Sequence, residues 1–276
     1  MDDAAQHATP QHAPSHDMPP LPPGLAAERR GAVAVLRLSR PHKRNALDDE
    51  TVLGVERFFS ALPPDVRAVV VHGEGDHFCA GLDLNSLTDM DATGGIAHSQ
   101  RWHRAFERIE GGAVPVVAAL HGAVVGGGLE LAMACHIRVA DRTAFYALPE
   151  GQRGIFVGGG AAVRLPRLIG LARMQDMMLT GRTYGAEEGA SVGFSQYVVE
   201  PGQALAKAVE LAERAAKTAP LTTFAVLHAL PRIAEADPRI GGLMESLMAA
   251  IACGDKDAKA SLRAFLEGRA AKVQHR

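Results

Sequence analysis

The chain has 276 residues, of which 47% are hydrophobic and 22% are charged, and its formal net charge is −2. This length suits one large domain, with or without a small appendage, and the composition suits a globular core. The near-zero charge and an aromatic fraction of only 5% argue against a nucleic-acid-binding or membrane-surface protein. No stretch approaches the roughly 20 apolar residues of a membrane span.

The N-terminal stretch, residues 1–24, is rich in Pro, His and Ala, and we expect it to be a disordered tail. It lacks the apolar segment of a secretory signal, and it has no arginine before Arg29, which a transit peptide would need. Three histidines in the tail could bind a metal ion, although a solvated tail is the favoured interpretation: His7, His12 and His16.

The cysteine content indicates a reducing compartment. The three cysteines are odd in number and far apart: Cys79, Cys135 and Cys253. Their spacing fits neither a disulfide framework nor a zinc site, so we expect no metal centre and a cytoplasmic location.

Residues 25–200 alternate strand, loop and helix patterns. Strands are predicted at residues 32–38, 68–71, 114–120 and 137–140. Helices are predicted from Asp48 onward, where the aspartate can cap the first turn, and at residues 99–109 and 129–135. Unbroken apolar runs such as residues 68–71 are typical of strands buried on both faces of a sheet. The pattern therefore predicts an α/β fold with a mainly parallel sheet.

Residues 201–276 form a predicted helical C-terminal segment. Apolar residues recur at helical spacing over residues 204–219, 221–233 and 242–253, and a further helix is expected at 256–267. A segment this apolar needs a surface to pack on, which could be the chain's own sheet or a neighbouring subunit.

The glycine loop Gly126-Gly127-Gly128 lies between a predicted buried strand and a short helix. Glycines let the backbone approach a ligand, and free N–H groups at a helix N-terminus stabilise negative charge. Two such donors could form an oxyanion hole for a thioester carbonyl. A tight packing turn explains the glycines equally well. The sequence matches neither a phosphate loop nor a dinucleotide-binding fingerprint.

A second small-residue loop, residues 78–84, follows the predicted strand at 68–71. The carboxyl ends of parallel strands are where open α/β sheets bind ligands. Ala80 and Gly81 allow close backbone approach, and Leu82 could offer a second N–H donor. Taken alone, this stretch is more simply a structural loop.

Two glutamates are candidates for acid/base chemistry. Glu130 lies one turn into an apolar helix, where a carboxylate is costly without a partner or a function. Glu150 follows Pro149 in an apolar, loop-like context. Taken singly, Glu130 could serve the helix dipole and Glu150 would be expected at the surface.

These features together resemble the crotonase, or enoyl-CoA hydratase/isomerase, superfamily. The resemblance covers nearly all of the chain after the tail. It rests on motifs in the family's order and separation: Arg40-Pro41, Asn45-Ala46-Leu47, Phe78 to Leu84, Gly126 to Ala132, Pro149-Glu150 and Gly158-Gly159-Gly160. Glu130 and Glu150 stand twenty positions apart, as the two glutamates of hydratases in this family do.

The resemblance implies a ββα spiral core and a helical C-terminal segment that trimerises, so the chain would be a homotrimer or homohexamer. It implies that the backbone N–H groups of Leu82 and Gly127 form the oxyanion hole. Glu130 and Glu150 would then hold a water molecule, deliver hydroxide to Cβ and a proton to Cα of an acyl-CoA thioester. It implies no metal and no redox cofactor, since coenzyme A is part of the substrate.

For coenzyme A itself, the resemblance implies contacts with the backbone around Ala80, Leu82 and Asp83. The chain departs from the family at two lysine positions, which here hold Asn85 and Gly268. We therefore expect the CoA phosphates to be met by other basic residues, namely Lys43, Arg44, Arg269 or Lys272.

Trp102 and Phe106 are the candidates for the acyl pocket. They share a helix face at i, i+4 spacing, on a helix that borders the acyl pocket in this family. With Ser99 and the stretch 146–160, they resemble a bacterial subgroup that includes (methylthio)acryloyl-CoA hydratase. The alternative for Trp102 is an ordinary core aromatic.

The sequence therefore predicts an enoyl-CoA hydratase acting on a short or methylthio-substituted acryloyl-CoA. The first alternative is another crotonase activity, such as an enoyl-CoA isomerase or an acyl-CoA hydrolase. The second is a non-catalytic acyl-CoA binding protein. Retention of both glutamates favours hydration over these two.

Overall fold

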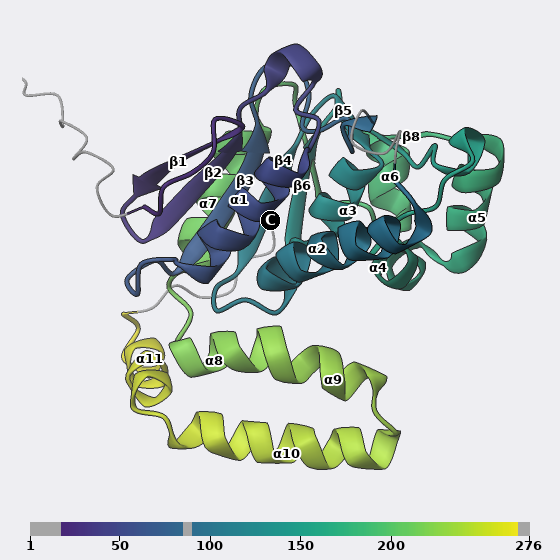
Figure 1. Cartoon of the computed structure of the whole chain (residues 1–276). Coiled ribbons are helices and arrows are strands. Elements are labelled where there is room, and N and C mark those ends of the chain that lie inside the picture. The colour runs from purple at the N-terminus through teal and green to yellow at the C-terminus, as the bar shows by residue number, and fades with distance from the viewer. Residues whose placement is uncertain (1–17, 85–89, 270–276) are drawn as a thin grey trace, which may run out of the picture.

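A six-stranded sheet forms the centre of the structure, a computed structural model that describes residues 18–84 and 90–269. Its strands lie in the order β1 (Leu25–Arg30), β2 (Val33–Leu38), β3 (Ala68–Gly73), β4 (Val116–Leu120), β6 (Ile137–Asp141) and β9 (Tyr197–Val199). β1 and β2 are antiparallel and every other neighbouring pair is parallel. The predicted α/β fold with a mainly parallel sheet is confirmed (Figure 1).

The sheet is buried on both faces, as its apolar strands predict. On one face lie α1 (Asp49–Ser60) and α2 (Ala92–Glu110), and on the other lies α7 (Ala204–Ala215) (Figure 1). Alternate residues of β3 pack on opposite faces of the sheet. Val69 and Val71 belong to the larger core, whereas Val70 packs in the cluster that includes α7.

Helix α1 begins where the sequence predicts. The side chain of Asp48 accepts a hydrogen bond from the Thr51 N–H at 2.9 Å, which caps the first turn. Other core helices within the described residues are η1 (Pro41–Lys43), α3 (Gly127–Ala134), η3 (Gly151–Arg153), α4 (Ala161–Ile169), α5 (Leu171–Thr180) and α6 (Ala186–Val192).

A second, three-stranded sheet brings two distant turns together. It consists of β5 (Ala123–Val125), β7 (Phe145–Ala147) and β8 (Tyr184–Gly185). Val125 and Ala147 are paired in register in the parallel β5–β7 ladder, and the Gly126 N–H donates to the Ala147 carbonyl at 3.0 Å. The glycine loop after β5 therefore lies beside the segment after β7, which carries Glu150.

The segment before β1 extends the packed structure further toward the N-terminus than the sequence suggests. Met18 and Leu21, within the predicted tail of residues 1–24, are partly buried against the main core. Residues 1–17, with His7, His12 and His16, lie outside the described residues, as do Asn85 and Lys272. All three cysteines are free, as expected.

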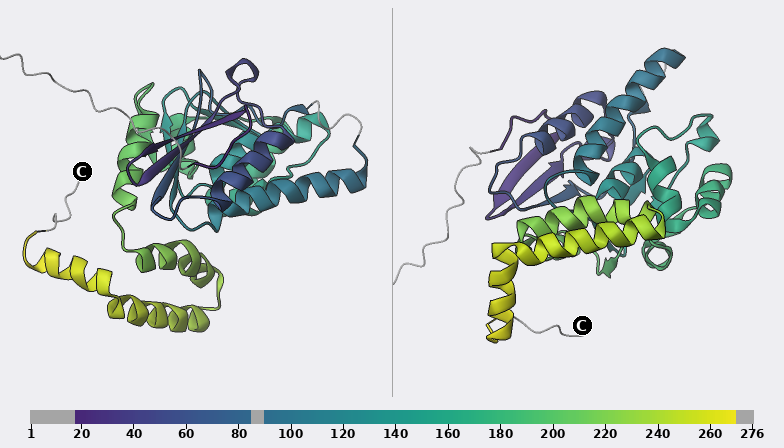
Figure 2. Two further views of the ribbon diagram at one scale, coloured as in Figure 1. Left: turned by 60° about the vertical axis from the view of Figure 1, so that its left-hand side comes forward. Right: turned by 90° about the horizontal axis from the view of Figure 1, so that it is seen from below.

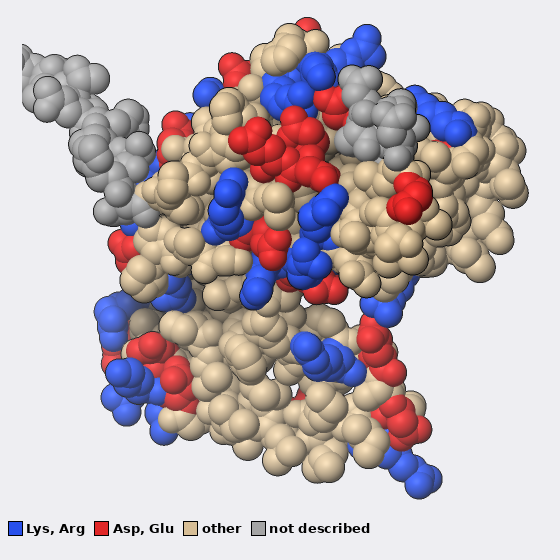
Figure 3. Space-filling model, in the orientation of Figure 1, with Lys and Arg blue, Asp and Glu red and all other residues tan. Residues whose placement is uncertain are grey.

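Of the predicted helical segment 201–276, α7 packs on the sheet, whereas the described helices from residue 220 onward, here called the C-terminal segment, project from the core (Figures 1 and 2). It comprises α8 (Pro220–Phe224), a π-helical turn (Ala225–Ala229), α9 (Leu230–Glu235), α10 (Pro238–Gly254) and α11 (Lys256–Leu266). Its helices pack mainly on one another. Apolar side chains more than half exposed include Leu243, Leu247, Ile251, Leu262 and Leu266. Figure 3 shows this surface as a broad area with few charged side chains across its middle.

Candidate active site

Leu47 forms a parallel bridge with Leu82 but makes its hydrogen bonds to the two neighbours of Leu82. Leu47 donates its N–H to the Gly81 carbonyl at 2.7 Å and accepts the Asp83 N–H at 2.8 Å. In such a parallel bridge the middle residue points its own N–H to the opposite side. The Leu82 N–H therefore stays available for a ligand.

The second donor is Gly127, the first residue of α3. The preceding Gly126 has a φ of 54°, a left-handed value that favours glycine and produces the sharp turn from β5 into the helix. A Cβ built on Gly81 would lie 3.2 Å from the Gly127 nitrogen, and one built on Gly127 would lie 3.4 Å from the Leu82 nitrogen. The two N–H groups are thus neighbours, and only small residues allow that approach.

Glu130 lies one turn into α3 and is 3% exposed. One carboxylate oxygen, Oε1, accepts the N–H groups of Gly159 at 2.8 Å and Ala161 at 3.0 Å. Burial raises the pKa of Glu130 above its ordinary value, and these two hydrogen bonds oppose that shift. The backbone of the turn at residues 159–161 therefore holds this carboxylate in place.

Glu150 directly precedes the short helix η3 and is only 8% exposed, so the expectation that it lies at the surface is wrong. Its Oε1 would lie 2.7 Å from a Cβ on Gly126, and its buried Oε2 has no hydrogen-bond partner among the described residues. Burial raises the pKa of Glu150 to about 7, and the nearby charge of Glu130 adds to the rise. A carboxyl group with that pKa can either give or take a proton near neutral pH.

One cavity of about 350 Å³ joins these groups. Its wall includes both glutamates, Leu82 and Gly127, together with the predicted residues Ala80 and Trp102. Two N–H donors and two carboxyl groups around one space can stabilise an oxyanion while moving a proton on and off carbon.

Of the two predicted aromatic residues, only Trp102 lines the cavity. Its ring edge lies against Gly127, where an added Cβ would approach Cζ3 to 2.5 Å. Phe106 is fully buried one turn further along α2 and packs edge-to-face against Trp102, with ring centroids 5.6 Å apart. The structure therefore places Phe106 behind the tryptophan as support.

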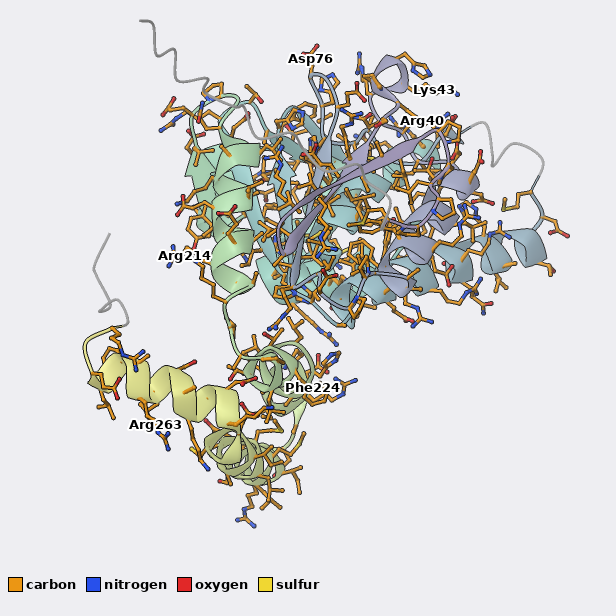
Figure 4. The ribbon with its side chains drawn as sticks, turned by 90° about the vertical axis from the view of Figure 1, so that its left-hand side faces the viewer. Arg40, Lys43, Asp76, Arg214, Phe224 and Arg263 are labelled. Carbon is orange, nitrogen blue, oxygen red and sulfur yellow. The ribbon has the colours of Figure 1, made fainter. Side chains whose placement is uncertain are left out.

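Two of the basic residues predicted to meet coenzyme A, Lys43 and Arg44, lie beside the loop of residues 78–84. Asp83 Oδ2 accepts Lys43 Nζ at 2.8 Å and Arg40 Nη2 at 3.1 Å, and the Arg44 carbonyl accepts the Ala80 N–H at 2.9 Å. Figure 4 shows Arg40 and Lys43 close together at one end of the core. Asp83 thus holds two cations. Arg269 lies in the remote C-terminal segment.

Several cavity residues were not among the predicted site residues. His98 and Ser99 lie one turn before Trp102 on α2, and Arg153 and residues 155–159 also line the cavity. The Ser99 hydroxyl donates to the Gly158 carbonyl at 2.7 Å, which ties these two segments together. Helical spacing from Trp102 could have identified His98 and Ser99, since residues at i−3 and i−4 share a face.

The ranges 18–84 and 90–269 contain no group of three or more metal-ligating side chains arranged to hold an ion. None of the helices described is long and apolar enough to cross a membrane.

Comparison with known proteins identifies the family. Residues 28–276 match the model of the enoyl-CoA hydratase/isomerase family. The chain is 31% identical to the short-chain-enoyl-CoA hydratase of Clostridium acetobutylicum, over 88% of this chain and 94% of that protein.

Solved structures agree. A Rhodopseudomonas palustris protein carrying an enoyl-CoA hydratase name is 59% identical, with a TM-score of 0.88 over 92% of this chain and 98% of that one. The Bacillus anthracis enoyl-CoA hydratase is 29% identical, with a TM-score of 0.84 over 90% of this chain and 98% of that one. The chain therefore belongs to the enoyl-CoA hydratase/isomerase family of the crotonase superfamily and is an enzyme of the hydro-lyase type.

Proposed function

We propose that this enzyme adds water reversibly across the double bond of a 2-enoyl-CoA, with Glu130 and Glu150 as its acid/base pair. The observation that carries the proposal is the single cavity bordered by both carboxyl groups and by the N–H groups of Leu82 and Gly127. A pair of N–H donors without the carboxyl groups would suit many thioester reactions. Two buried carboxyl groups beside the donors favour hydration.

The proposed reaction balances within these groups. The thioester oxygen accepts hydrogen bonds from Leu82 and Gly127, so electron density can move onto it as an enolate. A water molecule held between the glutamates loses a proton to a carboxylate, and its oxygen bonds to Cβ. The enolate then collapses as Cα takes a proton from a carboxyl group. Each turnover consumes one water, and the pair returns to a state that shares one proton.

The size of the cavity favours a short acyl group. Its volume of about 350 Å³ lies near the lower end of the range of roughly 300–1,000 Å³ for ligand pockets. Trp102 limits the space beside Gly127. A methylthio-substituted acryloyl-CoA also fits this proposal, because a thioether sulfur packs favourably against an aromatic ring, by about 0.3–1.5 kcal/mol.

We further propose that Lys43 and Arg44 contact the phosphates of coenzyme A. The backbone at Ala80 and Leu82 would contact its adenine. The proposed reaction requires no metal and no redox cofactor. The exposed apolar surface of α10 and α11 favours a homotrimer or homohexamer, since an uncovered surface of this kind is usually an interface. Sedimentation of the full chain, with Leu247→Glu as the disrupting variant, measures that assembly.

The function is tested with crotonyl-CoA and methylthioacryloyl-CoA as substrates. Hydration removes the absorbance of the conjugated thioester, and mass spectrometry of the product shows the gain of one water. A hydrolase would instead release a free CoA thiol, and an isomerase would leave the mass unchanged. Tight binding of both thioesters without turnover would replace the proposal with a binding function.

A further inference from the structure

Arg164, on α4, is a buried arginine that the proposed hydration does not use. It is 7% exposed, and its Nε and Nη2 contact Glu110 Oε2 at 2.9 Å and 2.8 Å. Its Nη1 donates to the Gly159 carbonyl at 3.0 Å. Burying a guanidinium is costly unless its N–H groups are paired, so this geometry ties the Gly159 backbone to α4 and to the end of α2.

Gly159 is also the residue that holds Glu130. Its N–H donates to Glu130 Oε1, while its carbonyl accepts Arg164. A Cβ on Gly159 would lie 2.9 Å from Glu130 Oε2. At Gly160, φ is 108° and a Cβ would lie 2.0 Å from Arg164 Nη1. The turn therefore has no room for a residue larger than glycine at positions 159 and 160. It is held between Arg164 and Glu130.

Electrostatic interactions also connect Arg164 with Glu130. Glu130 is faced by His103 from α2, by Arg164 from α4 and by Glu150 from the segment after β7. Burial raises the pKa of Glu130, and the charges of His103 and Arg164 both act to lower it. Removing the guanidinium therefore loosens the turn and also removes a positive charge that favours the Glu130 carboxylate.

We propose that Arg164 is a positioning residue for Glu130, which it holds in place through the Gly159 turn. Glu110 orients the guanidinium for this role. The inference rests on the proposed function, in which Glu130 moves protons, although the contacts themselves do not depend on it.

The test is a titration of Glu130 that does not require turnover. In protein labelled at the glutamate δ-carbon with ¹³C, the Glu130 resonance is the one lost in Glu130→Gln. We expect Arg164→Met to raise the midpoint above that of wild type, because a positive charge near Glu130 is lost. Arg167→Met, on the same helix at an exposed ion pair with Glu235, is the matched control and leaves the midpoint unchanged.

Two further variants keep the test valid if Arg164→Met does not fold. Arg164→Lys retains the charge, but a single ammonium cannot contact both Glu110 and the Gly159 carbonyl, so kcat falls about tenfold or more while the midpoint stays near wild type. Glu110→Gln keeps the guanidinium and removes its counter-charge, which moves the midpoint to lower pH.

Kinetics supply the second measurement. In crotonyl-CoA hydration, the acidic limb of the kcat profile should shift with the Glu130 midpoint, whereas KM stays near wild type. A purely structural arginine would scale kcat equally at every pH. Unchanged midpoints in Arg164→Met and in Glu110→Gln would overturn the inference, whether or not wild type hydrates crotonyl-CoA. An inactive wild type with shifted midpoints would instead overturn only the proposed function.

Discussion

Glu150 and Gly126 approach so closely that a single methyl group between them would displace the carboxylate. A Cβ at Gly126 would lie 2.7 Å from Glu150 Oε1. The two residues meet because β5 and β7 are paired in parallel and both segments leave the small sheet at the same edge. Gly126 and Glu150 thus form one structural unit. Gly126 makes the turn that leads to the Gly127 N–H, and Glu150 carries the carboxyl group that titrates near neutral pH.

Gly126→Ala should damage both parts of this unit. With φ 54° and ψ −124°, Gly126 lies in a sparsely populated backbone region that costs a non-glycine residue about 1–3 kcal/mol, and the new methyl group displaces Glu150. We expect kcat for crotonyl-CoA to fall by about a hundredfold. Gly185→Ala is the matched control, because a Cβ there has nothing within 4 Å. Equal activity of the two variants would contradict the proposed geometry.

The raised pKa of Glu150 should also make stability depend on pH. The group titrates near 4.5 in the unfolded chain and near 7 in the folded one, so the folded state binds more protons between these values. The free energy of unfolding should therefore decrease as pH rises across that window, by about 3 kcal/mol. Urea unfolding at about pH 5 and pH 8 measures the change. Glu150→Gln should lose most of this dependence; an identical dependence in both proteins would exclude Glu150 as its source.

Trp102→Ala should change chain-length preference. Removing the indole enlarges the cavity, so the ratio of kcat/KM for octenoyl-CoA to that for crotonyl-CoA should rise about tenfold or more. Stability should fall by about 3–5 kcal/mol, as for other buried tryptophans. Phe58→Ala, at a fully buried aromatic outside the cavity wall, is the control for lost stability. It should leave the ratio unchanged, and a similar shift in both variants would argue against a cavity-wall role for Trp102.

Arg44→Ala should weaken recognition of coenzyme A without affecting the chemistry. Loss of a charged contact to phosphate should raise KM for crotonyl-CoA about fivefold to tenfold at low salt, with kcat retained. Crotonyl-pantetheine lacks the phosphoadenosine part and should show no difference between the variant and wild type. Arg214→Ala, on α7 (Figure 4), is the control for general loss of positive charge. An unchanged KM for crotonyl-CoA would place the phosphates elsewhere.

Local pattern predicted the framework of the fold but missed the elements that complete the site. The apolar runs of β3 and β4 and the cap at Asp48 are properties of contiguous residues, so they can be read directly from the sequence. β5 and β7 have three residues each, too few for a periodic signal, and their pairing joins positions about twenty residues apart. β1 is an antiparallel edge strand whose mixed, half-exposed residues carry no clear alternation.

The difference between local signals and long-range contacts also explains which site residues could be recognised from the sequence. Glu130 stood out because a carboxylate in an apolar helix is unusual wherever that helix packs. Glu150 did not, because its burial comes from contacts with Gly126 and the Glu130 region, which only the folded chain brings near. Arg164 had no local signal at all, since its role depends on Glu110 from α2 and on the Gly159 carbonyl.

The central claim is that Glu130 and Glu150 act together on one water molecule. Its most direct test is the rate of crotonyl-CoA hydration by Glu130→Gln, Glu150→Gln and the double variant, each checked for folding by circular dichroism. We predict that each single substitution lowers kcat by about a thousandfold, and that the double variant is little slower than either, because residues that act as a unit are strongly non-additive. Near-wild-type turnover in either single variant, or losses that multiply in the double variant, would contradict the account.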